Sequence, residues 1–462
     1  MIKRYALCYA SLLLWLLAFG CQTRTPEEMA NTPPMGWNSW DSFGVEVTEP
    51  QVKANADYMA LNLERYGWEY IVVDLGWYLP AELTTWTFKV ENPPQRIDDY
   101  GRVLPDIDKF PSASEGQGFK PLADYVHDLG LKFGIHIMRG IPWQAVEQNT
   151  PILGTDYTAR DIVAPNDTCV WYDGFLGINL DHPGGQAYYN SIIQLYADWG
   201  VDYIKADDML YPYHERDIEV MHQAIETSGR PMVLSLSPGP APPDRVEHLR
   251  EHANVWRISA DFWDDWRFLC RQFDLCKVWE ATATPGHWPD ADMLPLGKLR
   301  KTGPDDYVVQ QLGIPAPELT DEYSRFTDDE KQTLLTLWCI FRSPLMFGGH
   351  LPETEGGTYR LITNGEALQV NQHSHNNRQI YRNEARIVWA ADILNSRDKY
   401  IALFNVSDTE TSNVSVGWEA IGVSGTCIVR NLWRKQVIGE FRTLFSDELP
   451  PHGSGLYRII VK

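Results

Sequence analysis

The chain has 462 residues, which is enough for one large domain and a smaller one. Apolar residues make up 44% of it, as expected for a globular protein with a sizeable core. The formal net charge of −22 argues against a nucleic-acid partner, since nucleic acid selects basic surfaces, and suits an exported protein that acts on a neutral ligand.

The first 21 residues have the pattern of an export signal. A basic start precedes an apolar stretch from Leu12 to Phe19, which is too short and too early for a membrane-spanning helix. Residues 17–21 resemble a bacterial lipobox, so we expect cleavage before Cys21 and a lipid on its thiol, with an ordinary cleaved signal peptide as the alternative. Residues 22–32 would then tether an exported cell-envelope lipoprotein that meets the membrane only through this lipid.

Strand-like runs alternate with helical patterns from Pro33 to about residue 370. One helix is expected to begin after Thr48 and to stop at Gly67. The eight expected strands lie at 35–40, 70–74, 132–137, 201–207, 232–237, 255–259, 292–296 and 343–347. This alternation predicts an α/β fold, a closed (β/α)8 TIM barrel over residues 33–375. An open doubly wound sheet is the alternative, but no Gly-rich phosphate turn follows the first strand.

The pattern changes past residue 375. Short strand-like runs at 386–390, 400–405 and 425–431 are separated by turn residues, and helical periodicity is absent. This texture predicts a C-terminal antiparallel β-sandwich over residues 376–462.

Five cysteines follow Cys21, and their spacing does not suggest a zinc site. Cys270 and Cys276 could pair in an oxidising compartment, and the sequence leaves this open. Cys339 lies in an apolar helical run and is expected to be a buried thiol.

The segment 203–208 carries the clearest chemical signal. Lys205 and Asp207 are two residues apart on an expected strand, so both side chains point the same way at its C-terminal end. That end of a parallel barrel carries the chemistry, and a neighbouring Lys keeps a carboxylate ionised and available as a nucleophile. Asp208 is expected to be solvated or to cap a helix.

Polar residues also follow other expected strands. They are Asp74 after the second, His136 on the third, Arg257 and Asp261 after the sixth, and Asp290 and Asp292 beside the seventh. Unpaired carboxylates are costly to bury, so several at one barrel mouth, with two cations among them, predict a functional pocket. Asp264 and Asp265 are expected to open a helix instead.

Two carboxylates that flank a bond are the requirement of glycoside hydrolysis. Asp207 beside Lys205 suits the nucleophile. Asp261 precedes an aromatic segment, residues 262–266, and this apolar setting should raise its pKa as an acid at neutral pH requires. Arg257 would oppose that effect if it pairs with Asp261, and the sequence does not decide between the two.

Several motifs, taken in order, resemble glycoside hydrolase family 27, the α-galactosidase and α-N-acetylgalactosaminidase family. They are Pro34–Trp40, Lys205-x-Asp207, Arg257-x-x-x-Asp261, Trp288–Leu294, Ser343–Met346, and the C-terminal segments Asn431–Trp433 and Pro451–Gly453. The resemblance covers roughly Pro33 to Lys462.

The resemblance implies an exo-acting retaining hydrolase that releases terminal α-linked galactose by double displacement, without metal or organic cofactor. Asp207 matches the nucleophile and Asp261 the acid/base, with carboxyl groups roughly 5–6 Å apart if the enzyme is retaining. The expected substrate-binding residues are Trp40, Asp74, His136, Lys205, Ser237, Arg257, Asp292 and Met293. Trp40 would stack under the sugar, or else form part of the barrel floor.

Three departures from the family pattern bear on the substrate. Leu75 stands where the family usually has a second Asp, His136 where it has Tyr, and Ser235–Pro240 where α-galactosidases carry a Cys-Glu-Trp type sequence. A site that loses hydroxyl contacts changes its discrimination between sugars. The alternatives are therefore a β-L-arabinopyranosidase, whose sugar lacks the hydroxymethyl group, and an α-N-acetylgalactosaminidase. A non-catalytic surface glycan-binding lipoprotein is a further alternative, although binding alone does not require both carboxylates.

Overall fold

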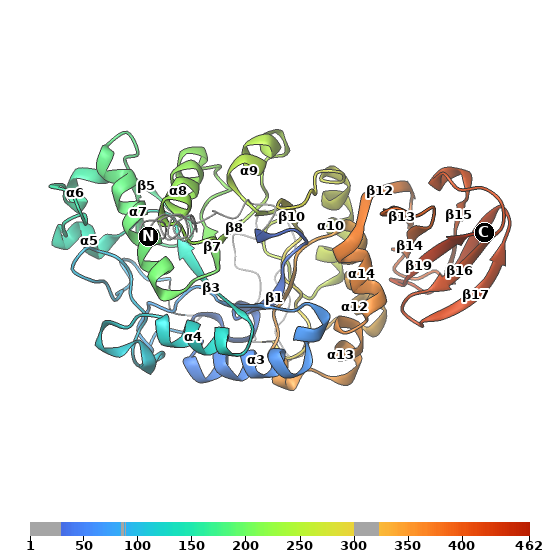
Figure 1. The fold of residues 1–462 in the computed structure, drawn as a ribbon, viewed down its shortest axis with the longest axis horizontal. Helices are drawn as coiled ribbons and strands as arrows, with labels where there is room; N and C mark the ends of the chain where they lie inside the picture. Colours follow the sequence, from blue (N-terminus) through green and yellow to red (C-terminus); the bar gives the residue numbers. More distant parts are fainter. Residues whose placement is uncertain (1–28, 85–86, 88, 300–322) are drawn as a thin grey trace, which may run out of the picture.

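The computed structural model describes residues 29–84, 87, 89–299 and 323–462 of the chain (Figure 1). The predicted signal sequence, Cys21 and most of the tether lie outside the described residues. Within the described ranges, no helix has the length and apolar character needed to cross a membrane.

Eight parallel strands curl into a barrel. They are β1 (Met35–Asn38), β2 (Tyr70–Val73), β3 (Lys132–Met138), β7 (Tyr203–Asp207), β8 (Val233–Leu236), β9 (Val255–Arg257), β10 (Trp288–Asp290) and β11 (Leu345–Phe347). Their order is β10-β9-β8-β7-β3-β2-β1-β11. The ring closes just beyond β10, where the Leu294 N–H donates to the Met346 carbonyl at 2.7 Å and Leu294 pairs in parallel with Phe347. The predicted (β/α)8 fold is confirmed.

The seventh barrel strand begins four residues earlier than predicted, at Trp288 rather than at residue 292. Asp292 has a φ of 85°, in the left-handed region, and this conformation interrupts the extended run that the sequence pattern favoured. The apolar residues after Asp292 include Leu294, which closes the barrel.

Helices surround the barrel in Figure 1. They are α2 (Trp40–Phe43), α3 (Glu49–Asn62), α4 (Lys120–Asp128), α5 (Trp143–Gln148), α6 (Ala159–Ile162), α7 (Pro183–Trp199), α8 (Glu215–Ser228), α9 (Val246–His252), α10 (Trp266–Val278), α12 (Asp328–Phe341), α13 (Gly356–Ile362) and α14 (Gly365–His373). Helix α3 begins after Thr48, as predicted, and the Thr48 N–H donates to the Gln51 side chain at 2.9 Å. A 3₁₀ turn extends the segment to Gly67, whose φ of 94° stops it.

A small antiparallel sheet between β3 and α7 was not predicted. It consists of β4 (Ile141–Pro142), β5 (Val163–Thr168) and β6 (Phe175–Ile178). Strand β5 is mostly polar and partly exposed, so its sequence lacks the alternation of apolar and polar residues that predicts a strand. The segment follows the C-terminal end of β3 and supplies part of the wall described below.

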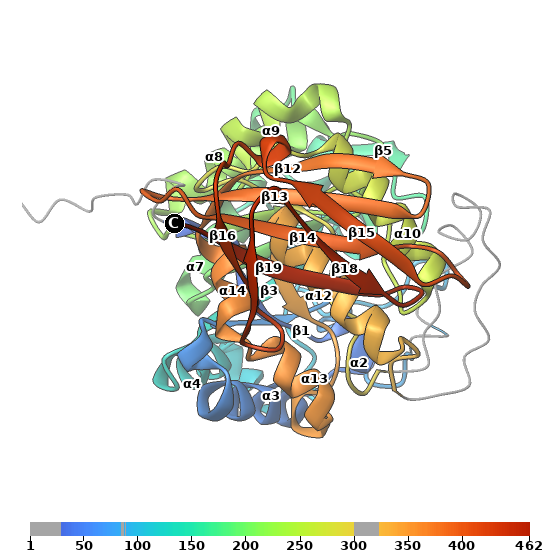
Figure 2. The same ribbon diagram turned by 90° about the vertical axis from the view of Figure 1, so that its right-hand side faces the viewer.

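The C-terminal strands form the predicted β-sandwich, seen face-on in Figure 2. One sheet contains β12 (Ser374–Asn383), β13 (Arg386–Ile393), β14 (Lys399–Asn405), β19 (Ser454–Val461), β16 (Cys427–Asn431) and β17 (Gln436–Phe441), and the other pairs β15 (Ser412–Gly417) with β18 (Leu444–Leu449). A separate apolar core lies between them. Helix α12 joins the two domains, since Thr333 donates to the His452 carbonyl at 2.6 Å.

The cysteine expectations can be compared with the structure directly. Cys270 and Cys276 are free thiols, so the possible disulfide between them does not form in this structure. Cys339 is fully buried on α12, as predicted. Packing rather than disulfides therefore holds the described part of the chain together.

Candidate active site

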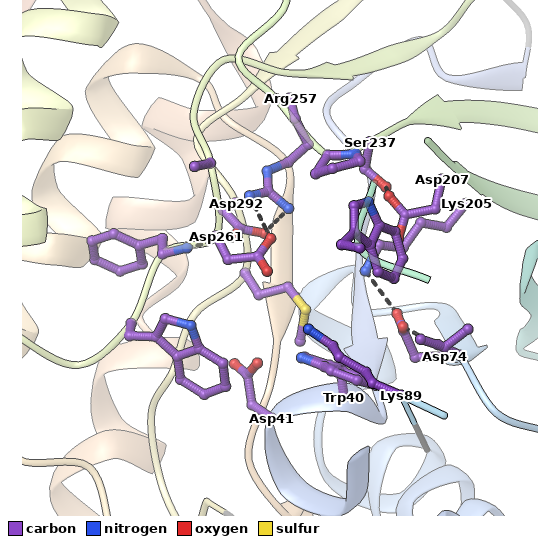
Figure 3. A pocket seen from close by; sticks show the side chains of 18 residues that line it. Trp40, Asp41, Asp74, Lys89, Lys205, Asp207, Ser237, Arg257, Asp261 and Asp292 are labelled. Carbon is purple, nitrogen blue, oxygen red and sulfur yellow. Dashed lines mark hydrogen bonds and ion pairs between the residues drawn. The ribbon is translucent and has the colours of Figure 1, made fainter. Parts of the chain in front are cut away.

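A pocket opens at the carboxyl ends of the barrel strands (Figure 3). Its lining comprises Trp40, Asp41, Asp74, Leu75, Lys89, Trp171, Lys205, Asp207, Ser237, Pro238, Gly239, Arg257, Ala260, Asp261, Phe262, Trp263, Asp292 and Met293. Nine of the ten predicted site residues are in this lining, and His136 is the exception. The strand-end pattern therefore brought together side chains that lie far apart in the sequence.

Asp207, the last residue of β7, is held by two hydrogen bonds. His136 Nε2 donates to its Oδ2 at 2.9 Å, and the Ser237 hydroxyl donates to its Oδ1 at 3.0 Å. Burial by itself raises the pKa of Asp207, but the hydrogen bond from His136 and then the charge of Lys205 outweigh burial and lower the pKa. Asp207 is therefore an ionised carboxylate at neutral pH.

Lys205 was expected to act on Asp207 as its neighbour, but its direct partner is Asp74. The Lys205 ammonium donates to Asp74 Oδ2 at 2.7 Å, and the Asn38 amide donates to the same oxygen at 2.6 Å. Burial is the largest influence and opposes ionisation of Asp74, but the charges of Lys205 and His136 and the hydrogen bonds from Lys205 and Leu75 together outweigh it, and the pKa falls to about 2. Lys205 thus lowers the pKa of Asp207 through its positive charge, without a direct hydrogen bond. Its hydrogen bond fixes Asp74 at the end of β2.

His136 is predicted to bind the substrate, and in the structure its partner is Asp207. Its side chain is fully buried on β3, next to Lys205 in the strand register, and it reaches Asp207 from behind. Its contact is with the carboxylate of Asp207.

Arg257, at the end of β9, joins two carboxylates on the opposite wall of the pocket. Its guanidinium lies 2.7 Å from Asp292 Oδ1 and 3.2 Å from Asp261 Oδ1. The Phe262 N–H donates to the second oxygen of Asp292 at 2.7 Å. Burial raises the pKa of Asp292 to about 7, with Arg257 opposing the rise and Asp261 adding to it.

The surroundings of Asp261 are only partly those expected. Phe262 and Trp263 beside it are buried, but the Asp261 side chain is 41% exposed and pairs with Arg257. The direct Arg257–Asp261 contact, which the sequence left open, is therefore present. Both carboxylates with expected catalytic roles, Asp207 and Asp261, face the same pocket.

Asp208 was expected to be solvated or to cap a helix, and this prediction was wrong. It is 2% exposed, has a φ of 63°, and accepts a hydrogen bond of 3.0 Å from Arg139. Arg139 comes from the end of the neighbouring strand β3, and its backbone N–H also donates to the Asp207 carbonyl at 3.1 Å. The buried ion pair between Arg139 and Asp208 therefore fixes the C-terminal end of β7, next to Asp207.

Sequence reasoning missed several pocket residues, among them Asp41, Lys89 and Trp171. Asp41 directly follows Trp40, which ends the first expected strand at 35–40, and this position could have marked it. Burial and then Asp292 raise its pKa well above the usual range, and its Oδ2 has no hydrogen-bond partner among the described residues. Lys89 and Trp171 come from long connections without a periodic signal, so nothing in the sequence pattern pointed to them.

Comparison with known proteins fits this geometry. The family model described as alpha galactosidase A matches residues 170–314, and the one described as alpha galactosidase C-terminal beta sandwich domain matches residues 383–459. The solved structure of a family 27 β-L-arabinopyranosidase from Geobacillus stearothermophilus, in complex with arabinose, is 46% identical with a TM-score of 0.90, over 95% of this chain and 100% of that one. This chain belongs to glycoside hydrolase family 27.

Other family members are more distant. An alpha-galactosidase of Cyamopsis tetragonoloba is 27% identical over 93% of this chain and 86% of its own length, and alpha-galactosidase 2 of Arabidopsis thaliana is 25% identical over 97% and 95%. Together with the pocket, membership establishes that the chain is a glycosidase. The resemblance inferred from the motifs is confirmed.

Two of the departures from the family 27 pattern lie on the pocket wall. Leu75 is 3% exposed and lines the pocket beside Asp74, to which its backbone N–H donates at 2.7 Å. Ser237, Pro238 and Gly239 form another part of the lining. The substituted positions thus face the space that would hold the sugar, and Ser237 also donates to the Asp207 carboxylate.

Proposed function

We propose that this glycosidase is exo-acting and retaining, and that it releases terminal α-linked galactose by double displacement. Asp207 is the nucleophile and Asp261 the acid/base. The observation that carries the proposal is the placement of these two carboxylates on one pocket in different surroundings, Asp207 ionised by its hydrogen bonds and Asp261 partly exposed beside Arg257.

In the first step the Asp207 carboxylate attacks the anomeric carbon and the bond to the leaving oxygen breaks, while Asp261 gives its proton to that oxygen. In the second step Asp261 takes a proton from water, the water oxygen attacks the same carbon, and Asp207 leaves. Each step inverts the anomeric centre, so the product keeps the configuration of the substrate. The expected carboxyl separation of roughly 5–6 Å remains a prediction.

The ion pairs of the pocket suit a neutral sugar with several hydroxyls. Lys205 with Asp74 and Arg257 with Asp292 present donors and acceptors that are already held in place. Trp40 is half-buried at the rim of the same space, where it can stack on the apolar face of a ring. These residues, with Ser237 and Met293, form the proposed glycone site.

The second candidate substrate is a β-L-arabinopyranoside, and Leu75 is the observation that favours it. L-arabinopyranose has the ring of galactose without its hydroxymethyl group, so an apolar wall in place of a carboxylate removes a hydroxyl partner but matches the smaller sugar. The relative that shares 46% of its residues with this chain is a β-L-arabinopyranosidase. Both sugars would be cleaved by the same mechanism, and Leu75 in the pocket wall would decide which of them is preferred.

The test is release of nitrophenol from α-galactoside, β-L-arabinopyranoside and α-N-acetylgalactosaminide substrates. Release from either of the first two, lost in Asp207→Ala, is expected, and the ratio of their kcat/KM values identifies the glycone. NMR of the first-formed sugar should show retained configuration. Sugar binding without release from any substrate would instead support a glycan-binding protein, and an inverted product would exclude double displacement.

We further propose that the protein is exported and anchored in the cell envelope through a lipid on Cys21. The basic start, the apolar stretch and the residues before Cys21 support this. Incorporation of labelled palmitate into the expressed full-length chain, lost in Cys21→Ala, is the expected result. Equal labelling of both proteins would rule out a lipid on Cys21.

A further inference from the structure

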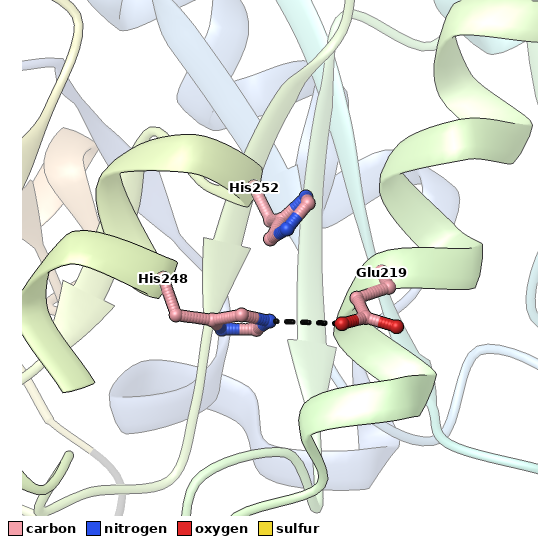
Figure 4. Close-up of side chains that lie close together, drawn as sticks. All are labelled: Glu219, His248 and His252. Carbon is pink, nitrogen blue, oxygen red and sulfur yellow. Dashed lines mark ion pairs between the residues drawn. The ribbon is translucent and has the colours of Figure 1, made fainter.

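Three side chains gather outside the barrel, between α8 and α9, and none of them lines the sugar pocket (Figure 4). Glu219 lies on α8, and His248 and His252 lie four residues apart on α9, so the two imidazoles share one helix face. One possible ligand atom from each lies within 4.8 Å of the other two. The His248 Nε2 atom is 3.6 Å from Glu219 Oε1.

Two imidazole nitrogens of this cluster make no hydrogen bond, although His248 Nε2 forms the 3.6 Å ion pair with Glu219 that Figure 4 marks. His248 Nε2 and His252 Nδ1 are both buried, and neither has a hydrogen-bond partner among the described residues. Buried polar atoms in folded proteins are nearly always paired, so an unpaired His252 Nδ1 beside the long His248–Glu219 contact calls for an explanation. A cation bound by both nitrogens and the carboxylate would satisfy all three groups.

The spacing suits a tetrahedral metal ion. Zinc binds imidazole nitrogen and carboxylate oxygen at about 2.0–2.2 Å, which places neighbouring ligands of a tetrahedron about 3.4 Å apart. The separation of 3.6 Å between His248 and Glu219 is close to this value. Small rotations of the side chains would bring the third ligand within the same range, and water would complete the tetrahedron.

A second layer of contacts is also present. Tyr213 Oη lies 2.6 Å from His248 Nδ1, so with Nε2 on a metal the Nδ1–H would donate to the tyrosine oxygen. Such a partner fixes both the tautomer and the orientation of a ligating imidazole.

We propose that Glu219, His248 and His252 bind a divalent transition-metal ion, with zinc as the best match to two imidazoles and one carboxylate. The ion links α8 to α9 on the outside of the barrel. It supplies no step of glycoside cleavage, because its ligands lie outside the sugar pocket. Its effect is on the stability of this side of the barrel.

The test uses the untagged full-length chain, stripped with a chelator and titrated with zinc chloride alone. The expected result is one tightly bound ion per chain, with affinity at least about tenfold weaker in Glu219→Gln and in His248→Ala combined with His252→Ala. His375→Ala is the matched control, because His375 is an exposed histidine on β12 of the sandwich. It should bind zinc as the unmodified chain does.

Thermal unfolding provides the second measurement. A ligand that binds only the native state stabilises it by mass action, so the midpoint of the unmodified chain should rise with zinc and that of Glu219→Gln should not. Unchanged glycosidase activity in each variant shows that it is folded. Zinc binding to the unmodified chain that is no tighter than to Glu219→Gln, or no shift of its midpoint, would overturn the proposal while leaving the proposed glycosidase unaffected.

Discussion

His136→Phe tests how Asp207 is kept ionised. The substitution keeps a planar ring at a fully buried position and removes the 2.9 Å hydrogen bond to the carboxylate. His136 lowers the pKa of Asp207 in the native protein, so its loss must raise that pKa. A protonated Asp207 cannot attack the sugar, and activity should therefore be lost at a higher pH as the solution is acidified.

The size of the effect follows from the hydrogen bond. A hydrogen bond to a charged group contributes about 1.5–3 kcal/mol, and each 1.4 kcal/mol is a factor of ten in an equilibrium constant. The Asp207 side chain is only 13% exposed, so solvent screening reduces the free energy of this hydrogen bond only a little. The proton affinity of Asp207 should rise about ten- to hundredfold in the variant, and the acidic limb of the pH profile should move toward neutral pH to match.

The assay is kcat/KM for a nitrophenyl glycoside across acidic and neutral pH. His136→Gln retains an N–H donor, so its acidic limb should lie between those of the Phe variant and the unmodified chain. His127→Phe is the matched control, because His127 makes a similar bond of 2.7 Å to Asp202 and neither residue lines the pocket. An acidic limb in His136→Phe that superimposes on that of the unmodified chain would refute the reasoning.

Other predictions concern the carboxylates and the pocket wall. Asp207→Ala and Asp261→Ala should each lower kcat by at least about a thousandfold with unchanged circular dichroism, and full activity in either would remove that residue from the mechanism. Leu75→Asp should shift the ratio of kcat/KM toward galactosides over arabinopyranosides, and an unchanged ratio would show that this wall does not set specificity. Arg139→Met should destabilise the fold by about 3–5 kcal/mol in urea unfolding, because it leaves the buried Asp208 carboxylate without its cationic partner; a loss under about 1 kcal/mol would contradict this. Burial raises the pKa of Asp217 to about 6, so its contribution to stability is present at low pH and lost as pH rises through 6. Asp217→Asn should therefore gain up to about 3 kcal/mol relative to the unmodified chain between pH 4 and pH 8, and a constant difference would exclude this charge effect.

Much of the site could be predicted because β-strands alternate and parallel barrels gather their carboxyl ends. Lys205, Asp207 and Arg257 were identified from their positions at strand ends alone. The order of motifs then identified the family, and the short strand-like runs separated by turn residues past residue 375 identified the sandwich. These are local patterns, and local patterns are what a single sequence displays.

Partner choice could not be predicted in the same way. Lys205 bonds Asp74 rather than Asp207, and Asp208 is buried by Arg139, because strands β2, β3 and β7 are neighbours in the barrel. That adjacency is a property of the closed sheet. The seventh strand was predicted at the wrong residues because Asp292 adopts a left-handed backbone conformation, which ends a run that looks extended in the sequence.

The most direct test of the proposed mechanism is a crystal structure of the enzyme with its released monosaccharide in the pocket. The anomeric carbon should lie between Asp207 and Asp261, with the two carboxyl groups roughly 5–6 Å apart and Leu75 on the side of ring carbon 5. A separation of about 6.5 Å or more, or a sugar bound away from either carboxylate, would contradict the retaining mechanism.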